Sequence, residues 1–167
     1  MKVFLDSSYF FPLIGVREAS IDQQFIPRLV RTNQLHFYYS TITLFEISAK
    51  GAKLIRDNKL SETNVVDGLN SIRNWEEMRS VDPWLGEIQR LSFYFRRDHK
   101  DFIDCLILAS AVVQANIFVT EDQQLRELAD SAWKKAISDL NPKFRIYNSS
   151  EMIDMGNKFS ETDFATD

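Results

Sequence analysis

Short apolar segments alternate with longer helical patterns along most of the chain. The segments with strand character are residues 2–5, 36–39, 117–119 and 144–147. The segments with helical character between them are residues 9–14, 18–33, 43–55, 101–115 and 122–136. Because a helix between two strands returns the chain to the same end of a sheet, this order predicts an α/β fold. Its mostly parallel sheet should be covered by helices on both faces.

The helix predicted over residues 101–115 has apolar side chains on nearly every side, which indicates a buried helix. Residues 61–78 and 83–96 predict two further helices, the first with an apolar stripe at helical spacing. The stripe consists of Val65, Leu69, Ile72 and either Trp75 or Met78. We interpret residues 57–97 as a helical arm inserted between elements of the core.

The length of 167 residues suits one domain with a core of its own. We expect this domain to span residues 1–150. Residues 151–167 are expected to form a C-terminal extension with a flexible end, because the sequence from Gly156 onwards is acidic and aperiodic.

The composition excludes several kinds of protein. With one cysteine and two histidines, the chain cannot form an internal disulfide or a Cys/His zinc site. Its five glycines are too widely spaced for a dinucleotide-binding or phosphate-binding loop. No segment is long and apolar enough to cross a bilayer and no secretory signal is visible, so we expect a cytoplasmic protein without membrane contact. The net charge of −4 leaves only a local patch for any contact with nucleic acid.

Four carboxylates follow predicted strands or begin the next helix, which is where ligands bind in open α/β sheets. They are Asp6, Glu46, Asp104 and Asp122. Each also has a structural alternative. Asp6 can cap the helix after the first strand, and Glu46 can pair with Lys50. Asp122 can complement the helix dipole in the first turn of a helix that Thr120 caps, with Gln123 completing a capping box. Asp104 is on an apolar helix face, where the alternative is a buried pair with a basic residue such as Arg97 or Lys100.

Four like charges at one edge of a sheet repel one another unless a cation neutralises them. Oxygen ligands favour a hard ion, Mg²⁺ or Mn²⁺. Such an ion lowers the pKa of bound water and stabilises charge on a phosphoryl oxygen. The acids therefore predict metal-dependent phosphodiester hydrolysis, with Asp6, Glu46, Asp104 and Asp122 as catalytic and metal-binding residues.

Four segments of the chain resemble, in order, the motifs of PIN-domain nucleases, in particular VapC-like toxins. They are KVFLDSSYFFPLIG, STITLFEISAK, DFIDCLILASAV and IFVTEDQQL. By this resemblance the four acids match the acidic residues of the family, and Thr120 matches a hydroxyl residue that supports the site. We also expect Ser7 and Asp101 to support it, with Asp101 as a helix N-cap.

The resemblance implies a three-layer α/β/α fold and endonucleolytic cleavage of single-stranded RNA with Mg²⁺ or Mn²⁺. It also implies a homodimer and, for a toxin, a partner antitoxin. The apolar stripe within residues 61–78 is a second indication of a dimer, unless it packs on the chain's own core. Two other functions stay open: a non-catalytic interaction module of the same fold and, less favoured because Asp6-Ser7-Ser8 lacks a second aspartate, a phosphatase.

A basic cluster precedes the acidic helix, and we expect its side chains to contact RNA phosphates. It contains Arg96, Arg97 and Lys100, and a solvated helix end explains it equally well. His99, within the cluster, is expected at the surface. Unpaired bases could stack on an aromatic side chain near the acids, with Tyr9, Phe10 and Tyr38 as the candidates.

Overall fold

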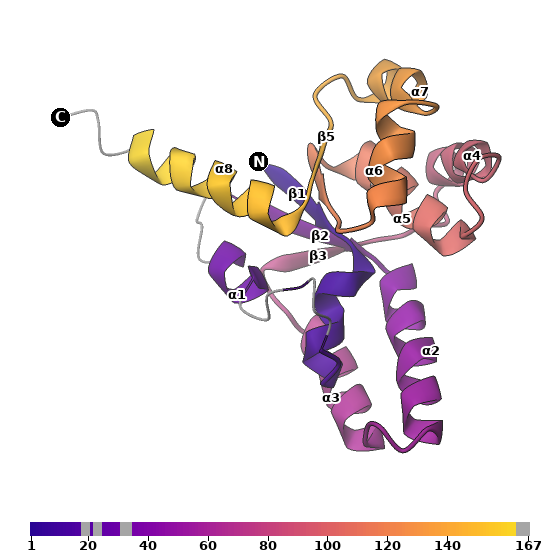
Figure 1. The fold of residues 1–167 in the computed structure, drawn as a ribbon, viewed down its shortest axis with the longest axis vertical. Coiled ribbons are helices and arrows are strands. Elements are labelled where there is room, and N and C mark those ends of the chain that lie inside the picture. Colours follow the sequence, from indigo (N-terminus) through magenta and orange to yellow (C-terminus); the bar gives the residue numbers. More distant parts are fainter. Residues whose placement is uncertain (18–20, 22–24, 31–34, 163–167) are drawn as a thin grey trace.

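The computed structural model describes residues 1–17, 21, 25–30 and 35–162 of the chain. In this part of the chain, five strands form one sheet in the order β3-β2-β1-β4-β5, and every pair of neighbours is parallel (Figure 1). The strands are β1 (Lys2–Leu5), β2 (His36–Ser40), β3 (Met78–Val81), β4 (Ile117–Val119) and β5 (Arg145–Tyr147). The α/β fold with a parallel central sheet is confirmed.

Helices cover both faces of the sheet, which gives three layers. One face is covered by α4 (Gly86–Phe95), α5 (Phe102–Gln114), α6 (Gln123–Asp130) and α7 (Lys134–Leu140). The other is covered by η1 (Ser7–Ile14), a 3-10 helix, with α1 (Phe25–Val30), α2 (Ile42–Arg56), α3 (Glu62–Arg73) and α8 (Ser149–Thr162). Successive strand residues point to opposite faces, so Phe4 packs with the first group whereas Val3 and Leu5 pack with the second.

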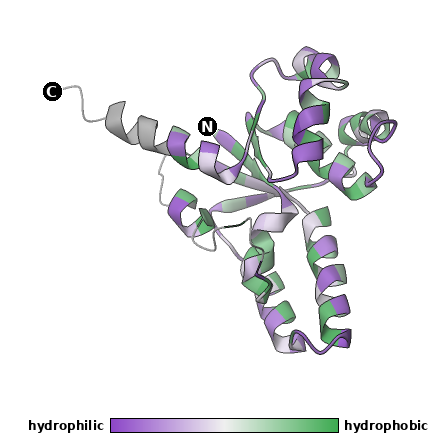
Figure 2. Ribbon diagram, viewed as in Figure 1, coloured by the Kyte–Doolittle hydropathy of each residue, from purple (hydrophilic) through white to green (hydrophobic). Residues whose placement is uncertain are grey.

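The helix signals of the sequence have clear outcomes. α5 is the expected buried helix. The helix expected over residues 43–55 is α2, which carries both hydrophobic and hydrophilic residues along its length (Figure 2). The prediction of a helix over residues 18–33 is confirmed at α1. Residues 18–20, 22–24 and 31–34 are outside the described part, and Ile21 is not helical. No helix in the described segments is long and apolar enough to cross a membrane.

The structure corrects the interpretation of residues 57–97. The helix expected to reach Met78 ends at Arg73, and residues 78–81 form β3, an edge strand that pairs with β2. This segment is therefore part of the sheet as well as of its helical cover. Gly68 of α3 lies so close to η1 that an added Cβ would be 2.6 Å from the Leu13 carbonyl oxygen. The division of the chain into one domain and an extension stays a prediction.

Two further boundaries differ from the prediction. The helix expected over residues 122–136 is broken into α6 and α7. The break admits Trp133 to the core, where it is fully buried against Phe95, with 4.5 Å between the ring centroids. α8 extends to Thr162, so the aperiodic sequence from Gly156 is helical as far as that residue, whereas the flexible end of the extension stays a prediction. Residues 163–167 are outside the described part.

Candidate functional site

The predicted acids lie at the edge of the sheet where the parallel strands end. Asp6 follows β1, and Asp122 is two residues beyond Thr120, which follows β4. Glu46 is near the start of α2, the helix after β2, and Asp104 is in the first turn of α5. Because β2, β1 and β4 are neighbours in the sheet, their carboxyl ends bring these segments together.

Asp6 is held by hydrogen bonds on both carboxylate oxygens. The backbone N–H of Ser7 donates to Oδ1 at 2.7 Å, and the hydroxyl of Thr120 donates to Oδ2 at 2.7 Å. Asp6 thereby caps η1, as its structural alternative predicted. Burial raises the pKa of Asp6 to about 6, and the charges of Glu46 and Asp122 raise it too, while these hydrogen bonds lower it. Asp6 therefore caps η1 and also belongs to the carboxylate cluster.

Asp104 is paired with a histidine. The His99 Nε2 atom is 3.0 Å from Asp104 Oδ2, so the expected basic partners Arg97 and Lys100 are not the ones that make this contact. His99 is only 5% exposed, and the expectation that it is a surface residue is wrong. Burial raises the pKa of Asp104 to about 6; the charges of Asp101 and Asp6 act in the same direction, and His99 opposes them.

Glu46 supplies an oxygen that lacks a partner. Its Oε2 atom is buried and accepts no hydrogen bond from any described residue. Burial raises the pKa of Glu46, and the charges of Asp104 and Asp101 add to this, whereas Ser7 and Lys50 lower it. A buried carboxylate oxygen without a donor is costly, and a cation is the group that best satisfies it. This observation fits the donor set that Mg²⁺ or Mn²⁺ requires.

The N-cap of α6 is not Thr120, as the sequence had suggested, but Asp122, whose Oδ1 accepts from the Leu125 N–H at 2.9 Å. Its own N–H donates to the Thr120 hydroxyl oxygen at 3.1 Å. Thr120 is fully buried, and its single hydroxyl group bridges Asp6 and Asp122, donating to the first and accepting from the second. The contact is consistent with a supporting role for Thr120.

The other supporting residues lie where the sequence suggested. Ser7 is buried, and its hydroxyl donates to the Thr43 hydroxyl at 2.9 Å. Asp101 caps α5 by accepting from the N–H groups of Ile103 and Asp104, so its N-cap prediction is confirmed. Among the described residues, no three Asp, Glu, His or Cys side chains form a ready-made metal cage. The acids nevertheless raise one another's pKa values, so their charges interact, although the described residues do not form a preformed metal-binding group.

The basic and aromatic candidates have mixed outcomes. Arg96, Arg97 and Lys100 are exposed beside α5, although Arg96 also donates to the His99 carbonyl at 2.9 Å and Arg97 lies over the Tyr94 ring. Tyr9, Phe10 and Tyr38 are at most 8% exposed. They cannot offer a ring face to a base, so the stacking prediction is wrong for all three.

One groove of the protein lies away from the four acids. It has a volume of about 500 Å³ between α6, α7 and β5, and the four acids do not line it.

Comparison with known proteins gives the relationship of the whole fold. No protein-family model matches the sequence, and no curated protein matches it. A chain in the crystal structure of VapBC2 from Rickettsia felis bound to a DNA fragment from their promoter is similar, with a TM-score of 0.55 and 14% sequence identity. The similarity covers 89% of this chain and 98% of that one. It confirms the fold that the resemblance to VapC-like PIN domains predicted.

Proposed function

We propose that this chain is a Mg²⁺- or Mn²⁺-dependent endoribonuclease that hydrolyses phosphodiester bonds in single-stranded RNA. The observation that carries the proposal is that the half-buried carboxyls of Asp6, Glu46 and Asp104 lie together at the carboxyl edge of the parallel sheet. Their pKa values, raised by burial and by one another's charges, support it. The fold shared with a VapBC2 chain supports a role as the toxin of a toxin-antitoxin pair, with an antitoxin as partner.

Asp6, Glu46, Asp104 and Asp122 would hold the ion. When bound, it supplies Lewis acidity that lowers the pKa of water and stabilises charge on a phosphoryl oxygen. Thr120 and His99 orient the carboxylates of Asp6 and Asp104 through one oxygen each. The exposed Arg96, Arg97 and Lys100 would contact the RNA phosphates.

The test is cleavage of an end-labelled single-stranded RNA with Mn²⁺, with Mg²⁺ and with excess EDTA. An Asp6→Asn variant prepared in parallel controls for contaminating nucleases. Cleavage that survives EDTA contradicts the proposal. Binding of RNA without cleavage favours the non-catalytic module, and release of phosphate from a phosphomonoester without RNA cleavage favours a phosphatase.

We expect millimolar Mn²⁺ or Mg²⁺ to raise the melting temperature of the protein. An ion that relieves the repulsion among the carboxylates binds the folded state more tightly than the unfolded state. Circular dichroism melts with and without metal measure the effect, and an Asp6→Asn, Asp104→Asn double variant should show a smaller shift. Identical melting temperatures across the metal titration contradict a site in the folded protein.

We also expect a homodimer. The stripe on α3 does not support it, because Val65 and Ile72 are buried within the chain's own core. The dimer is supported by the resemblance and by two large apolar side chains that are exposed on α2 and α4. The exposed fraction is 61% for Phe45 and 57% for Phe93. Light scattering should give twice the 19.5 kDa mass of the chain. A mass of one chain at micromolar protein removes the prediction.

A further inference from the structure

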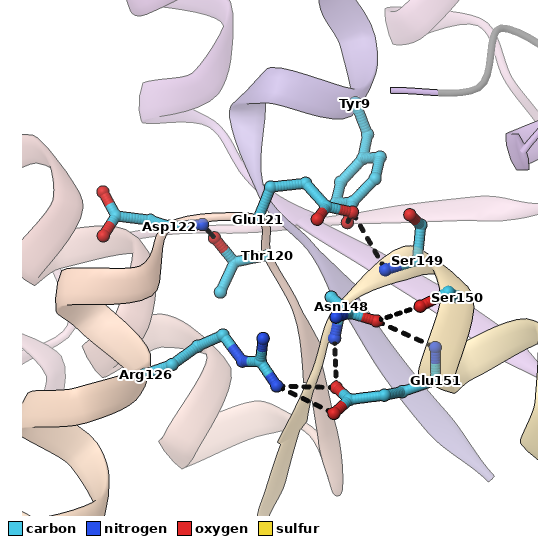
Figure 3. Close-up of polar contacts among 9 residues, drawn as sticks. All are labelled: Tyr9, Thr120, Glu121, Asp122, Arg126, Asn148, Ser149, Ser150 and Glu151. Carbon is cyan, nitrogen blue, oxygen red and sulfur yellow. Dashed lines mark hydrogen bonds and ion pairs between the residues drawn. The ribbon is translucent and has the colours of Figure 1, made fainter. Parts of the chain in front are cut away.

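Residues at the start of α8 contact the loop that carries Thr120 and Asp122. We call the contacting residues the α8 clamp, which consists of Tyr9, Glu121, Arg126, Ser149 and Glu151 (Figure 3). The clamp joins the loop after β4 to η1 on one side and to α8 on the other. Asp122 lies in the sequence between two of its members, Glu121 in the loop and Arg126 in the second turn of α6.

Glu121 is the centre of the clamp. The hydroxyl of Tyr9 donates to its Oε1 at 2.8 Å, and the N–H of Ser149 donates to the same oxygen at 2.9 Å. Tyr9 is 2% exposed, three residues after Asp6 in η1. A single carboxylate oxygen therefore ties the Asp6 segment, the Asp122 loop and the first residue of α8 together.

A second contact, between Arg126 of α6 and Glu151 of α8, lies just after the loop in the sequence. Arg126 Nη2 donates to both carboxylate oxygens of Glu151, at 2.9 and 2.7 Å. Glu151 is itself fixed, because it accepts from the Asn148 N–H while its own N–H donates to Asn148 Oδ1. This is a capping box at the start of α8, so Glu121 and Arg126 are both joined to a rigid turn.

The backbone adds a third point of attachment. The N–H of Thr120 donates to the Tyr147 carbonyl at 3.0 Å. Residues 120 and 121 of the loop and residue 126 of α6 are thus each bonded to the segment 147–151, and Asp122 lies within the part of the chain that these contacts restrain. Thr120 in turn donates to Asp6, so displacement of the loop would disturb the contacts of two proposed ligands.

We propose that Glu121 is a positioning residue for the carboxylate site: it fixes the loop from which Thr120 and Asp122 reach the site by joining that loop to η1 and α8. It acts through its neighbours rather than on the ion or the RNA. The inference rests on the proposed function. It also makes the start of α8 part of the framework of the site, although the sequence suggested an extension from residue 151.

The experiment compares Glu121→Ala and Glu121→Gln with wild type by calorimetric titration with Mn²⁺ in the absence of RNA. Loss of a residue that orients metal ligands weakens metal binding by about tenfold or more, so the alanine variant should bind Mn²⁺ about tenfold more weakly. Glutamine keeps an acceptor oxygen for Tyr9 and Ser149 and should restore affinity to within about twofold of wild type. The Mn²⁺ concentration for half-maximal RNA cleavage should follow the same order.

Glu127→Ala is the matched control, because it removes the same charge from α6 but breaks only an exposed contact with Gln123. It should bind Mn²⁺ as wild type does. Tyr9→Phe is the second variant; it keeps the buried ring, removes one donor to Glu121 and should weaken Mn²⁺ binding even if the alanine variant does not fold.

If Glu121→Ala and Tyr9→Phe both bind Mn²⁺ with wild-type affinity, the inference about Glu121 is wrong, while the proposed function is unaffected. A Glu121→Gln variant as weak as the alanine variant also overturns it, because the charge rather than the hydrogen bonds would then be responsible. Wild-type protein that binds no Mn²⁺ and cleaves no RNA overturns the proposed function together with this inference.

Discussion

Replacement of Asp104 by asparagine is expected to lower RNA cleavage by ~10² or more, because one well-placed charged group at a reaction centre has an effect of that order. The folded protein without metal should become more stable at pH 7. Asparagine keeps an oxygen that can accept from His99 Nε2, while it removes a partly buried negative charge that Asp101 and Asp6 repel.

The gain in stability should depend on pH in a predictable direction. Burial raises the pKa of Asp104 from 3.8 to about 6, so the folded wild type carries a penalty for ionisation that the unfolded chain does not. The penalty is complete above pH 6 and disappears below about pH 4. Melting temperatures of variant and wild type should therefore differ most above pH 6 and converge near pH 4.

The structural alternative for Asp104 demands the opposite result. If the contact with His99 serves only the fold, Asp104→Asn should lower the melting temperature and leave cleavage per folded molecule near normal. Both quantities are measured on one purified variant. Glu127→Ala serves as the control for loss of one negative charge at a distance from the cluster.

The second large effect is expected for Thr120→Val. Valine has nearly the shape of threonine, but it cannot donate to Asp6 Oδ2 or accept from the Asp122 N–H. At this fully buried position the loss should cost about 1–3 kcal/mol of unfolding free energy. Metal affinity should fall by roughly 10–100-fold, because the residue orients two proposed ligands.

The Thr120→Val variant should also shift the pH dependence of metal binding. The Thr120 hydrogen bond lowers the pKa of Asp6, which burial has already raised to about 6, so its removal raises that pKa further. Protons then compete with Mn²⁺ for the Asp6 carboxylate up to a higher pH. The pH at which Mn²⁺ affinity rises should therefore be higher in the variant than in wild type. Thr120→Ser keeps the hydroxyl and should behave as wild type; a serine variant as impaired as the valine variant contradicts the assignment to the hydroxyl.

Local patterns were sufficient to predict the central part of this fold. β1, β2 and β4 are short, mainly apolar runs that end at a polar residue or directly before one, and α5 has its N-cap and its apolar sequence in one continuous segment. The order of strands and helices then places the four acids at one edge, because parallel strands share the direction of their carboxyl ends. Their mutual effects on pKa are consistent with that placement.

The features that were missed depend on contacts between distant residues. Met78 continues the apolar spacing of α3, and only its pairing with Phe37 of β2 shows that it belongs to a strand. His99 is buried because Trp133, from the break between α6 and α7, packs against its ring. The start of α8 did have a local signal, since Asn148 and Glu151 have the spacing of a capping box.

The hydrogen bond between Asp6 and Thr120 joins residues that are 114 positions apart in the sequence. During translation, Asp6 leaves the ribosome first, and β4 with Thr120 and Asp122 follows only after most of the chain has been made. β1 has no partner on its β4 side until then. The carboxylates of Asp6 and Asp122 therefore cannot come together on the nascent chain until β4 has been made, and a nuclease activity of the kind proposed would begin only after that point in synthesis.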